Sequence, residues 1–455
     1  MSDSRQESKL IRNLGFWDLM AIAIGQIIGA GIMSSTGVAI GMTGTGVVLA
    51  FLISPILTIF SIFPTAILGA TVPATGGSYR YCSRILGKTP GMLYLLLYVT
   101  MNVNIAQFAL SFASYFVSIV SGLNQHLVAI VILTLFFIAN LIGTKSAAIL
   151  NSIMTIALIG GLLLFIVFGL PKADLAYIFN PDHLFVNGAF PFISTLALLS
   201  SATAGAQVIA ELGGETKNPG RTIPRVMIIS TFAVGIVYVL IAIVAAGVLP
   251  MEVVADQPLS LVARETMPGV FFYIFVIGAA LGATATTLNA TFSWVTKPLL
   301  VACDDGMLPK SLATVSKRGV PYKLLTFFYL VGLIPLVMGF DLAFITKFTT
   351  ANSLLTKLMI CMALFVLVSR SGDVLKKSSM KISPKQAKVI SAVGCIILCV
   401  LSSSLLLNLS AATLGFLAAL VVIVIVYTKT VTKNVVLEND LEVDYTTGKA
   451  DEDNT

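Results

Sequence analysis

Long apolar runs recur along this sequence with short polar segments between them, and this alternation constrains the fold more than any other feature. Each run is roughly 20 residues or more, the length that a helix needs to cross about 30 Å of hydrocarbon. Charged residues make up 11% of the chain and hydrophobic residues 57%, whereas soluble domains carry roughly 25% charged residues. The sequence therefore predicts an all-α integral membrane protein.

Twelve membrane-spanning helices are predicted, and the distribution of Lys and Arg between them predicts their orientation. With the N-terminus placed in the cytoplasm, 24 of the 28 Lys and Arg residues fall on the inner side, and Lys172 and Arg264 fall on the outer side. Basic residues collect in cytoplasmic loops of membrane proteins, so both termini are predicted to be cytoplasmic and the location is the cell (plasma) membrane. The predicted spans are residues 16–40, 46–70, 91–121, 126–143, 147–170, 189–212, 226–249, 269–301, 323–339, 343–369, 388–407 and 409–428.

Several classes of function are disfavoured by the sequence. The net charge of +7 is explained by the inner loops, so nucleic acid is not a predicted partner. The five cysteines are scattered, which argues against a disulfide framework or a zinc site, and neither a metal nor a cofactor is predicted. A membrane enzyme would need an intramembrane cluster such as paired His or Asp, and a channel would show a repeated pore motif. Neither pattern is present, so the protein is predicted not to be an enzyme.

Glycines interrupt the first apolar run. Gly25, Gly29 and Gly31 lie within seven residues, and each costs a helix about 1 kcal/mol relative to Ala. A helix broken within the membrane leaves backbone groups that must face protein, water or a ligand, and the N–H groups of its second half suit a carboxylate. The alternative is a glycine face for close helix packing, and the glycines alone leave both interpretations open.

The sixth apolar run contains a second weak point, the small and polar segment from Ser200 to Gln207. Two interrupted spans that lie five apart are expected of a five-plus-five inverted repeat with a binding site near the membrane midplane.

Four motifs, in order along the chain, make the sequence resemble one family. The first is Gly15-Phe-Trp-Asp18 followed by Gly25-x-x-Ile-Gly-Ala-Gly-Ile32. The others are Pro73-Ala-Thr-Gly-Gly-Ser-Tyr79, Glu215-Thr-Lys-Asn-Pro-Gly-Arg-Thr-Ile-Pro-Arg225, and Thr287-Leu-Asn289 with Asp305-Gly-Met-Leu-Pro309 and Val320-Pro-Tyr322. Together they resemble the amino acid permease branch of the amino acid–polyamine–organocation (APC) superfamily.

The resemblance implies a fold of ten helices in two inverted repeats, with helices 1 and 6 broken, plus two additional helices. The predicted organisation is a cytoplasmic tail (1–13), a first repeat with spans 1–5 (14–170), a second repeat with spans 6–10 (171–370), spans 11–12 (371–430) and an acidic cytoplasmic tail (431–455).

The resemblance also implies which residues bind an amino acid. In the family, N–H groups of the unwound first helix hold the substrate carboxylate, and carbonyls beside the two breaks hold its amine. By position the carboxylate site maps to Ile28, Gly29, Ala30, Gly31 and Ile32. The amine site maps to Ala23, Ile24, Ser200, Ser201 and Thr203.

The chain departs from the family pattern at three places. Many members carry an aromatic gate where this chain has Ser201, and many carry an acidic residue where it has Gln207. Some proton-coupled relatives carry a lysine in the fifth span where this chain has Leu158. That departure puts this mode of proton coupling in doubt.

Four residues are candidates for coupling or gating. Lys357 lies deep in the tenth span, where a lysine costs about 2.5–3.5 kcal/mol and is a functional candidate, unless it faces a wet cavity. Glu211 lies four residues before Glu215, near the inner end of the sixth span. It is expected either to pair with nearby Lys and Arg residues or to form an inner gate with Asp18. Tyr238 in the seventh span is a candidate for closing the pocket. The polar residues of the third and eighth spans are interpreted mainly as contacts between helices.

The predicted function is a secondary active transporter of amino acids, permease or exchanger, that works by alternating access. The predicted midplane contains no Asp or Glu, which favours neutral amino acids. A polyamine or other organic-amine transporter or antiporter is the alternative, and would require acidic groups for a second cationic centre. The predicted partners are the amino acid, the lipid bilayer, and either protons or a counter-substrate.

Overall fold

The computed structural model describes residues 14–71, 77–142, 147–207, 209, 216–316, 319–371, 374–375, 378 and 380–437. These residues form helices connected by short turns, and the part of the chain that is described holds no β-strand, only an isolated bridge between Leu14 and Thr216. The all-α class predicted from the sequence is confirmed.

The helices fall within the apolar runs or in the loops that join them. The first half of the chain contains α1 (Phe16–Ile27), α2 (Ala30–Thr43), η1 (Gly44–Gly46), α3 (Val47–Thr71), α4 (Gly77–Tyr81), η2 (Cys82–Leu86), α5 (Lys88–Met101), α6 (Asn104–Ile119), α7 (Gln125–Ile142), α8 (Ala147–Gly169), η3 (Leu170–Lys172), α9 (Leu175–Ile178), α10 (Pro181–Leu184) and α11 (Ala189–Ala202). The second half contains α12 (Pro219–Gly247), α13 (Met251–Val254), α14 (Ser260–Thr266), α15 (Gly269–Ile274), η5 (Phe275–Leu281), α16 (Gly282–Trp294), α17 (Lys297–Asp304), η6 (Lys310–Ala313), α18 (Tyr322–Val337), α19 (Leu342–Arg370), α20 (Pro384–Leu406) and α21 (Ala411–Thr430).

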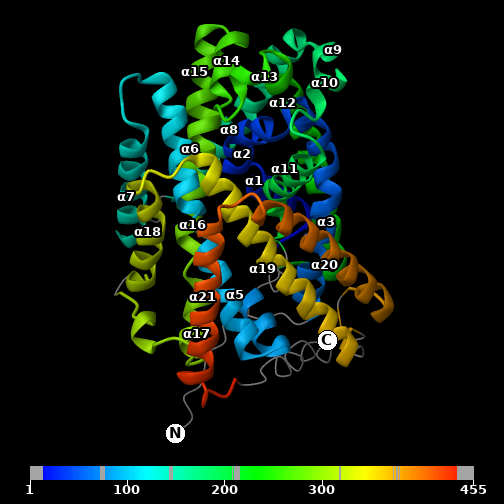
Figure 1. Ribbon diagram of the computed structural model, residues 1–455, viewed down its shortest axis with the longest axis vertical. Helices are drawn as coiled ribbons and strands as arrows, with labels where there is room; N and C mark the ends of the chain where they lie inside the picture. Colours follow the sequence, from blue (N-terminus) through cyan, green and yellow to red (C-terminus); the bar gives the residue numbers. More distant parts are fainter. Residues whose placement is uncertain are drawn as a thin grey trace, which may run out of the picture.

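Eight helical stretches of the described residues are long and apolar enough to cross a membrane, from Ala30–Thr71 to Ala411–Thr430. Four shorter apolar helices accompany them: Phe16–Ile27, Ala157–Lys172, Ala189–Ala202 and Tyr322–Val337. In Figure 1 the short helices α9, α10, α13 and α14 gather at one end of the molecule, which we call the upper end, and α17 lies toward the opposite, lower end.

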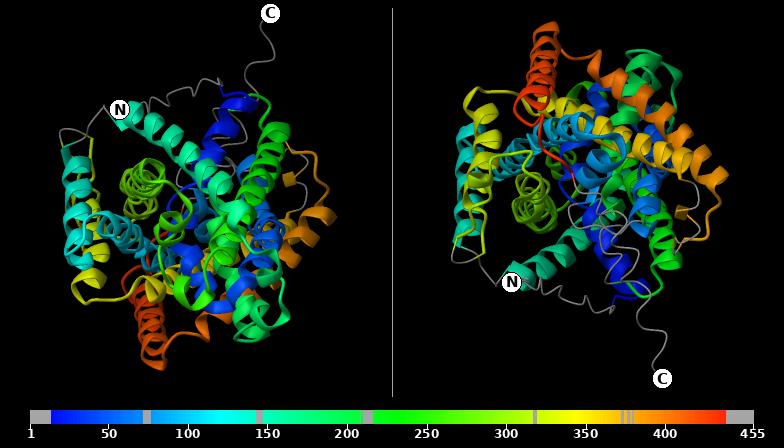
Figure 2. Two further views of the ribbon diagram at one scale, coloured as in Figure 1. Left: turned by 90° about the horizontal axis from the view of Figure 1, so that it is seen from above. Right: turned by 90° about the horizontal axis from the view of Figure 1, so that it is seen from below.

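Two buried clusters divide the interior. The first core is built mainly from α1, α2, α3, α8, α11 and α12, and includes Ile27, Phe51 and Tyr238. The second core is built mainly from α5, α6, α7, α16 and α18, and includes Leu288 and Phe328. Figure 2 shows α7 and α18 side by side at the edge of the second group, where the Thr134 and Tyr329 hydroxyls lie 3.0 Å apart. Helix α19 contributes buried residues to both cores.

Several apolar runs are not regular α-helices along their whole length. The third run turns at Asn102–Val103, between α5 and α6, and the eighth contains the π-helix η5. In α3, Pro64 has no N–H to give to the Phe60 carbonyl. That carbonyl packs against Gly394 of α20, where an added Cβ would lie 2.9 Å from the Phe60 oxygen.

Candidate functional site

The first apolar run breaks between α1 and α2. Helix α1 ends at Ile27, Ile28 leaves the helical region with ψ 88°, and Gly29 is extended with φ −142° and ψ −151°. The Ile28 N–H still bonds the Ile24 carbonyl at 2.8 Å, and the Gly29 N–H bonds the Ile27 carbonyl at 3.0 Å. The glycines therefore break the helix, as one of the two sequence interpretations predicted, because Gly29 adopts a conformation outside the helix.

Two of the backbone groups released at this break are bonded by side chains from other helices. In a continuous helix the Gly31 N–H would bond the Ile27 carbonyl. Instead, Tyr238 of α12 donates its hydroxyl to that carbonyl at 2.7 Å. At the start of α2, the Ala30 N–H bonds Oγ1 of Thr287 on α16 at 3.1 Å.

The sixth apolar run breaks beside the first. Helix α11 ends at Ala202, and residues 204–207 form a 3₁₀ turn. A Cβ on Gly31 would lie 3.4 Å from the Ala202 Cα, and one on Gly205 would lie 2.3 Å from the Gln26 carbonyl oxygen. Because only glycine fits at this second contact, Gly205 permits the two interruptions to meet.

A threonine pair fixes the end of α11. Thr58 of α3 donates to the Ser200 carbonyl at 2.8 Å, and its hydroxyl lies 2.6 Å from that of Thr203. Both threonines and Ser200 are buried. Of the other residues mapped to the amine site, Ala23 is buried, whereas Ser201 and Ile24 are half-buried.

One turn above the break, a polar chain joins three helices. Ser34 of α2 donates to the Ala30 carbonyl at 2.8 Å, and Gln107 of α6 donates its amide to the Ser34 hydroxyl at 2.9 Å. Thr349 of α19 donates to the Gln107 side-chain carbonyl at 3.0 Å. This buried chain links the second half of the first run to the third and tenth runs.

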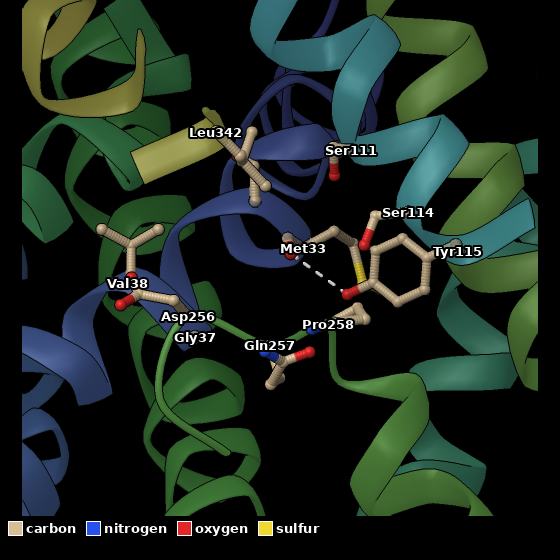
Figure 3. A pocket seen from close by; sticks show the side chains of 11 residues that line it. Met33, Gly37, Val38, Ser111, Ser114, Tyr115, Asp256, Gln257, Pro258 and Leu342 are labelled. Atoms are coloured by element: carbon tan, nitrogen blue, oxygen red, sulfur yellow. Dashed lines mark hydrogen bonds between the residues drawn. The ribbon is translucent and has the colours of Figure 1, made fainter. Parts of the chain in front are cut away.

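The upper end is closed above that chain by the segment between α13 and α14. The Asp256 N–H bonds the Gly37 carbonyl at 2.9 Å. Tyr115 of α6 donates to the Met33 carbonyl at 3.1 Å and accepts the Leu259 N–H at 3.2 Å. Figure 3 shows Met33, Gly37, Tyr115 and Asp256 around a cavity of about 10 Å³, which is at the lower limit for one water molecule. An amino acid cannot pass between these residues without moving them.

Asp256 is the ionisable group of this closure. Burial raises the pKa of its carboxyl, the Asp341 carboxylate adds to that rise, and the Lys347 ammonium opposes it. Its backbone has φ +57°, a left-handed conformation that residues other than glycine and asparagine rarely adopt.

Comparison with known proteins identifies the family. The family model described as amino acid permease matches residues 14–434. The chain belongs to the amino acid permease family. The match covers both interrupted runs and extends through the last apolar helix, so the family accounts for nearly the whole chain.

Named relatives transport different solutes. The branched-chain amino acid permease BcaP of Bacillus subtilis is 27% identical over 399 residues, covering 81% of this chain and 83% of that protein. The cationic amino acid transporter 1 of Arabidopsis thaliana is 28% identical over 389 residues, covering 80% of this chain and 63% of that protein. The methylthioribose transporter of Bacillus subtilis is 26% identical over 347 residues, covering 69% and 72%. The permease family thus points to a membrane transporter of amino acids rather than to an enzyme.

Three of the four coupling and gating candidates lie in different parts of the permease. Asp18 is exposed and accepts the Gly15 N–H at 2.8 Å, so its carboxylate caps α1. Tyr238 is fully buried and bonds at the break. Lys357 is only 3% exposed, and no carboxylate of the described residues pairs with it. Glu211, like Glu215, lies outside the described residues.

Sequence reasoning missed the contacts that tie these helices together. Thr287, Gln107 and Thr349 were visible as polar residues within apolar runs, but their partners lie far away in the sequence. Thr287 is 257 residues from Ala30, and Thr349 is 242 from Gln107. A polar residue in a span signals some buried partner, yet the sequence does not specify which.

Proposed function

We propose that this permease is a secondary active transporter of neutral amino acids that works by alternating access. The observation that carries the proposal is the contact between the two interrupted runs, where Gly31 meets Ala202 and Gly205 meets Gln26. Two broken helices that face each other place backbone donors and acceptors within the membrane, where a zwitterion supplies an anion and a cation to satisfy them.

In this proposal the substrate carboxylate binds at the start of α2. Of the N–H groups mapped from Ile28 to Ile32, those of Ala30, Gly31 and Ile32 open the first turn of α2 and form the cradle. Those of Ile28 and Gly29 bond the Ile24 and Ile27 carbonyls. The positive end of the α2 dipole favours an anion at this turn. The substrate ammonium binds carbonyls beside the breaks, at Ala23 and Ile24 on α1 and at Ser200, Ser201 and Thr203 on the sixth run. The Ser200 carbonyl already accepts the Thr58 hydroxyl at 2.8 Å and the Thr203 hydroxyl at 3.3 Å. The ammonium would therefore replace the longer of these two bonds, and the Thr203 hydroxyl would keep the Leu199 carbonyl at 3.1 Å.

The proposed movement is a rocking of the first core against the second. The polar chain of Ser34, Gln107 and Thr349 and the closure around Asp256 would open on one side of the membrane and reform in each cycle. The helices of the described residues fit a scheme of twelve spans with a five-plus-five inverted repeat, in which the upper end faces outward and both termini are cytoplasmic. Lys357 is the proposed coupling residue, and Asp18 and Glu211 are proposed for an inner gate.

A polyamine or other organic-amine transporter is the second candidate. It requires a carboxylate near the breaks to neutralise the additional cationic centre. The described residues from 19 to 43 and from 189 to 207 contain no Asp or Glu. This composition favours a neutral zwitterion.

Counterflow into liposomes tests the proposal. Purified protein is reconstituted with internal unlabelled L-leucine, external radiolabelled L-leucine is added, and a panel of amino acids and putrescine competes, with and without a pH gradient. Neutral amino acids should compete and putrescine should not. Competition by putrescine without competition by any amino acid would disprove the assignment. Uptake that requires internal amino acid and ignores the gradient would identify an exchanger.

A further inference from the structure

The Thr287 hydroxyl already holds one of the N–H groups that the proposed function assigns to the substrate carboxylate. Its Oγ1 accepts the Ala30 N–H at 3.1 Å and donates to the Ala283 carbonyl at 2.8 Å. A Cβ on Gly29 would lie 2.7 Å from the same Oγ1. The hydroxyl is therefore seated at the first turn of α2, and the absence of a side chain on Gly29 is what allows this approach.

A carboxylate and this hydroxyl would compete for the same donor. Hydrogen bonds to a charged acceptor are roughly twice as strong as those between neutral groups, and α2, with 14 residues, adds a dipole that favours the anion. The hydroxyl has a second partner, the Ala283 carbonyl of its own helix, to which it donates. It can thus give up the Ala30 N–H without being left unbonded.

The contact also joins the two halves of the interior. Ile27, Ile28 and Ile32 around the break belong to the first core, and so does Ala283 at the start of α16. Leu288 and Phe292, which follow Thr287 on α16, belong to the second core, so Thr287 lies where α16 passes from one core to the other. Releasing the Thr287 hydroxyl from Ala30 would remove a hydrogen bond between helices that the proposed rocking movement must separate.

We propose that the Thr287 hydroxyl is an internal competitor of the substrate carboxylate. It satisfies the Ala30 N–H in the arrangement described here, yields it to the carboxylate of an arriving amino acid, and thereby couples substrate binding to loss of the contact between α2 and α16. This inference rests on the proposed function, because it assumes that the α2 N-terminus binds a carboxylate. It assigns Thr287 a role in regulating that site.

Two substitutions separate the hydroxyl from the rest of the side chain. Thr287→Val keeps the shape and removes the competitor, whereas Thr287→Ser keeps the hydroxyl. Thr284→Val is the matched control, because the buried Thr284 hydroxyl donates only to the Ala280 and Leu281 carbonyls one turn earlier. The probes are L-leucine and 3-methylbutylamine, the amine with the same side chain and no carboxylate.

Thr287→Val should bind leucine about 2- to 10-fold more tightly than the wild type, the range that corresponds to one net hydrogen bond. Thr287→Ser and Thr284→Val should keep the wild-type Kd, and the Kd for 3-methylbutylamine should not change in any variant. Leucine should also raise the Tm of Thr287→Val by more than it raises the wild-type Tm, which shows that the variant is folded and responsive.

Two results would overturn the inference, and they differ in what else they reject. If the wild type prefers leucine to the amine but Thr287→Val binds leucine equally or more weakly, then the hydroxyl is a fixed contact or a ligand of the substrate, and the inference alone is wrong. If the wild type binds the amine as well as leucine, the carboxylate cradle of the proposed function is wrong, and the inference is rejected with it.

Discussion

The Tyr238 hydroxyl donates a 2.7 Å hydrogen bond to the Ile27 carbonyl at the residue where the first helix ends. The Tyr238 side chain is fully buried and packs edge-on against Phe51, with ring centroids 5.6 Å apart. Lipid offers no donor to a carbonyl freed within the membrane. Tyr238 therefore stabilises the break from within the protein, and its role in closing the pocket stays a prediction.

Tyr238→Phe should destabilise the break. It removes one of the two hydrogen bonds to the Ile27 carbonyl, which keeps the Gly29 N–H at 3.0 Å. The net loss is about 0.5–1.5 kcal/mol, so both the Tm and the affinity for leucine should fall. Tyr427→Phe is the control, because the Tyr427 hydroxyl also donates to a backbone carbonyl, that of Met307 at 3.2 Å, at the lower end. The control should lose stability without a change in leucine Kd, whereas equal Kd values for Tyr238→Phe and the wild type would argue against a role at the site.

Gly29→Val should abolish leucine binding, and Gly29→Ala should weaken it at least 10-fold. Even the first carbon of a side chain would lie 2.7 Å from the Thr287 Oγ1, so the threonine and the first turn of α2 must shift. Gly160→Ala, whose Cβ would meet no atom within 4 Å, is the control for a glycine replaced inside an apolar helix. Equilibrium binding measures the effect, and wild-type affinity in Gly29→Val would reject the carboxylate cradle.

Adjacent glycines on α8 give a test of packing against the π-helix η5. A Cβ on Gly161 would lie 2.6 Å from the Ala279 Cβ, whereas Gly160 has open space beside it. Gly161→Ala should lower stability by about 1–3 kcal/mol through overpacking. Gly160→Ala should be neutral or slightly stabilising, since alanine favours a helix. Thermal unfolding in detergent measures both, and equal Tm values would contradict the close contact between α8 and η5.

The sequence predicted what depends on local patterns, and missed what depends on packing. The breaks at Gly29 and after Ala202 followed from glycines and small polar residues inside apolar runs. Asp18 carried a local signal that was overlooked, because an acidic residue three positions after the N-cap is typical of a capping box. The partners of Thr287 and Tyr238 could not be read, because these contacts span 257 and 211 residues and depend on how the two broken runs pack.

Asp256 should make the closure of the upper end dependent on pH. The pKa of its carboxyl is raised in the closed arrangement, mainly by burial, so that arrangement binds the proton more tightly than an open or unfolded one. Its stability should therefore be greatest at low pH and should decrease as pH rises through the raised pKa. Lys347 limits the decrease and Asp341 increases it.

Asp256→Asn tests this sign. The amide cannot ionise, and asparagine tolerates the φ of +57° at this position, so the variant should keep the closed arrangement at neutral pH and lose this component of the pH dependence. Hydrogen exchange at the Leu259 N–H, which bonds Tyr115, reports the closure from pH 4 to 8. If protection of this N–H from exchange decreases as pH rises in both the wild type and the variant, the effect belongs to another group.

Lys357 provides the last test, because a buried ammonium that has no carboxylate partner among the described residues should be both costly and functional. It is 3% exposed within α19, and a lysine at the centre of a membrane helix costs about 2.5–3.5 kcal/mol on insertion scales. Lys357→Met should therefore raise the Tm. In liposomes the same variant should lose the response of leucine uptake to a pH gradient, if the wild type shows one. Lys357→Arg keeps the charge but does not release a proton in this pH range, so it should also lose the response without the gain in Tm. If both variants keep the response to the gradient, Lys357 is excluded from coupling. If Lys357→Met alone loses the response, the lysine acts as a fixed charge.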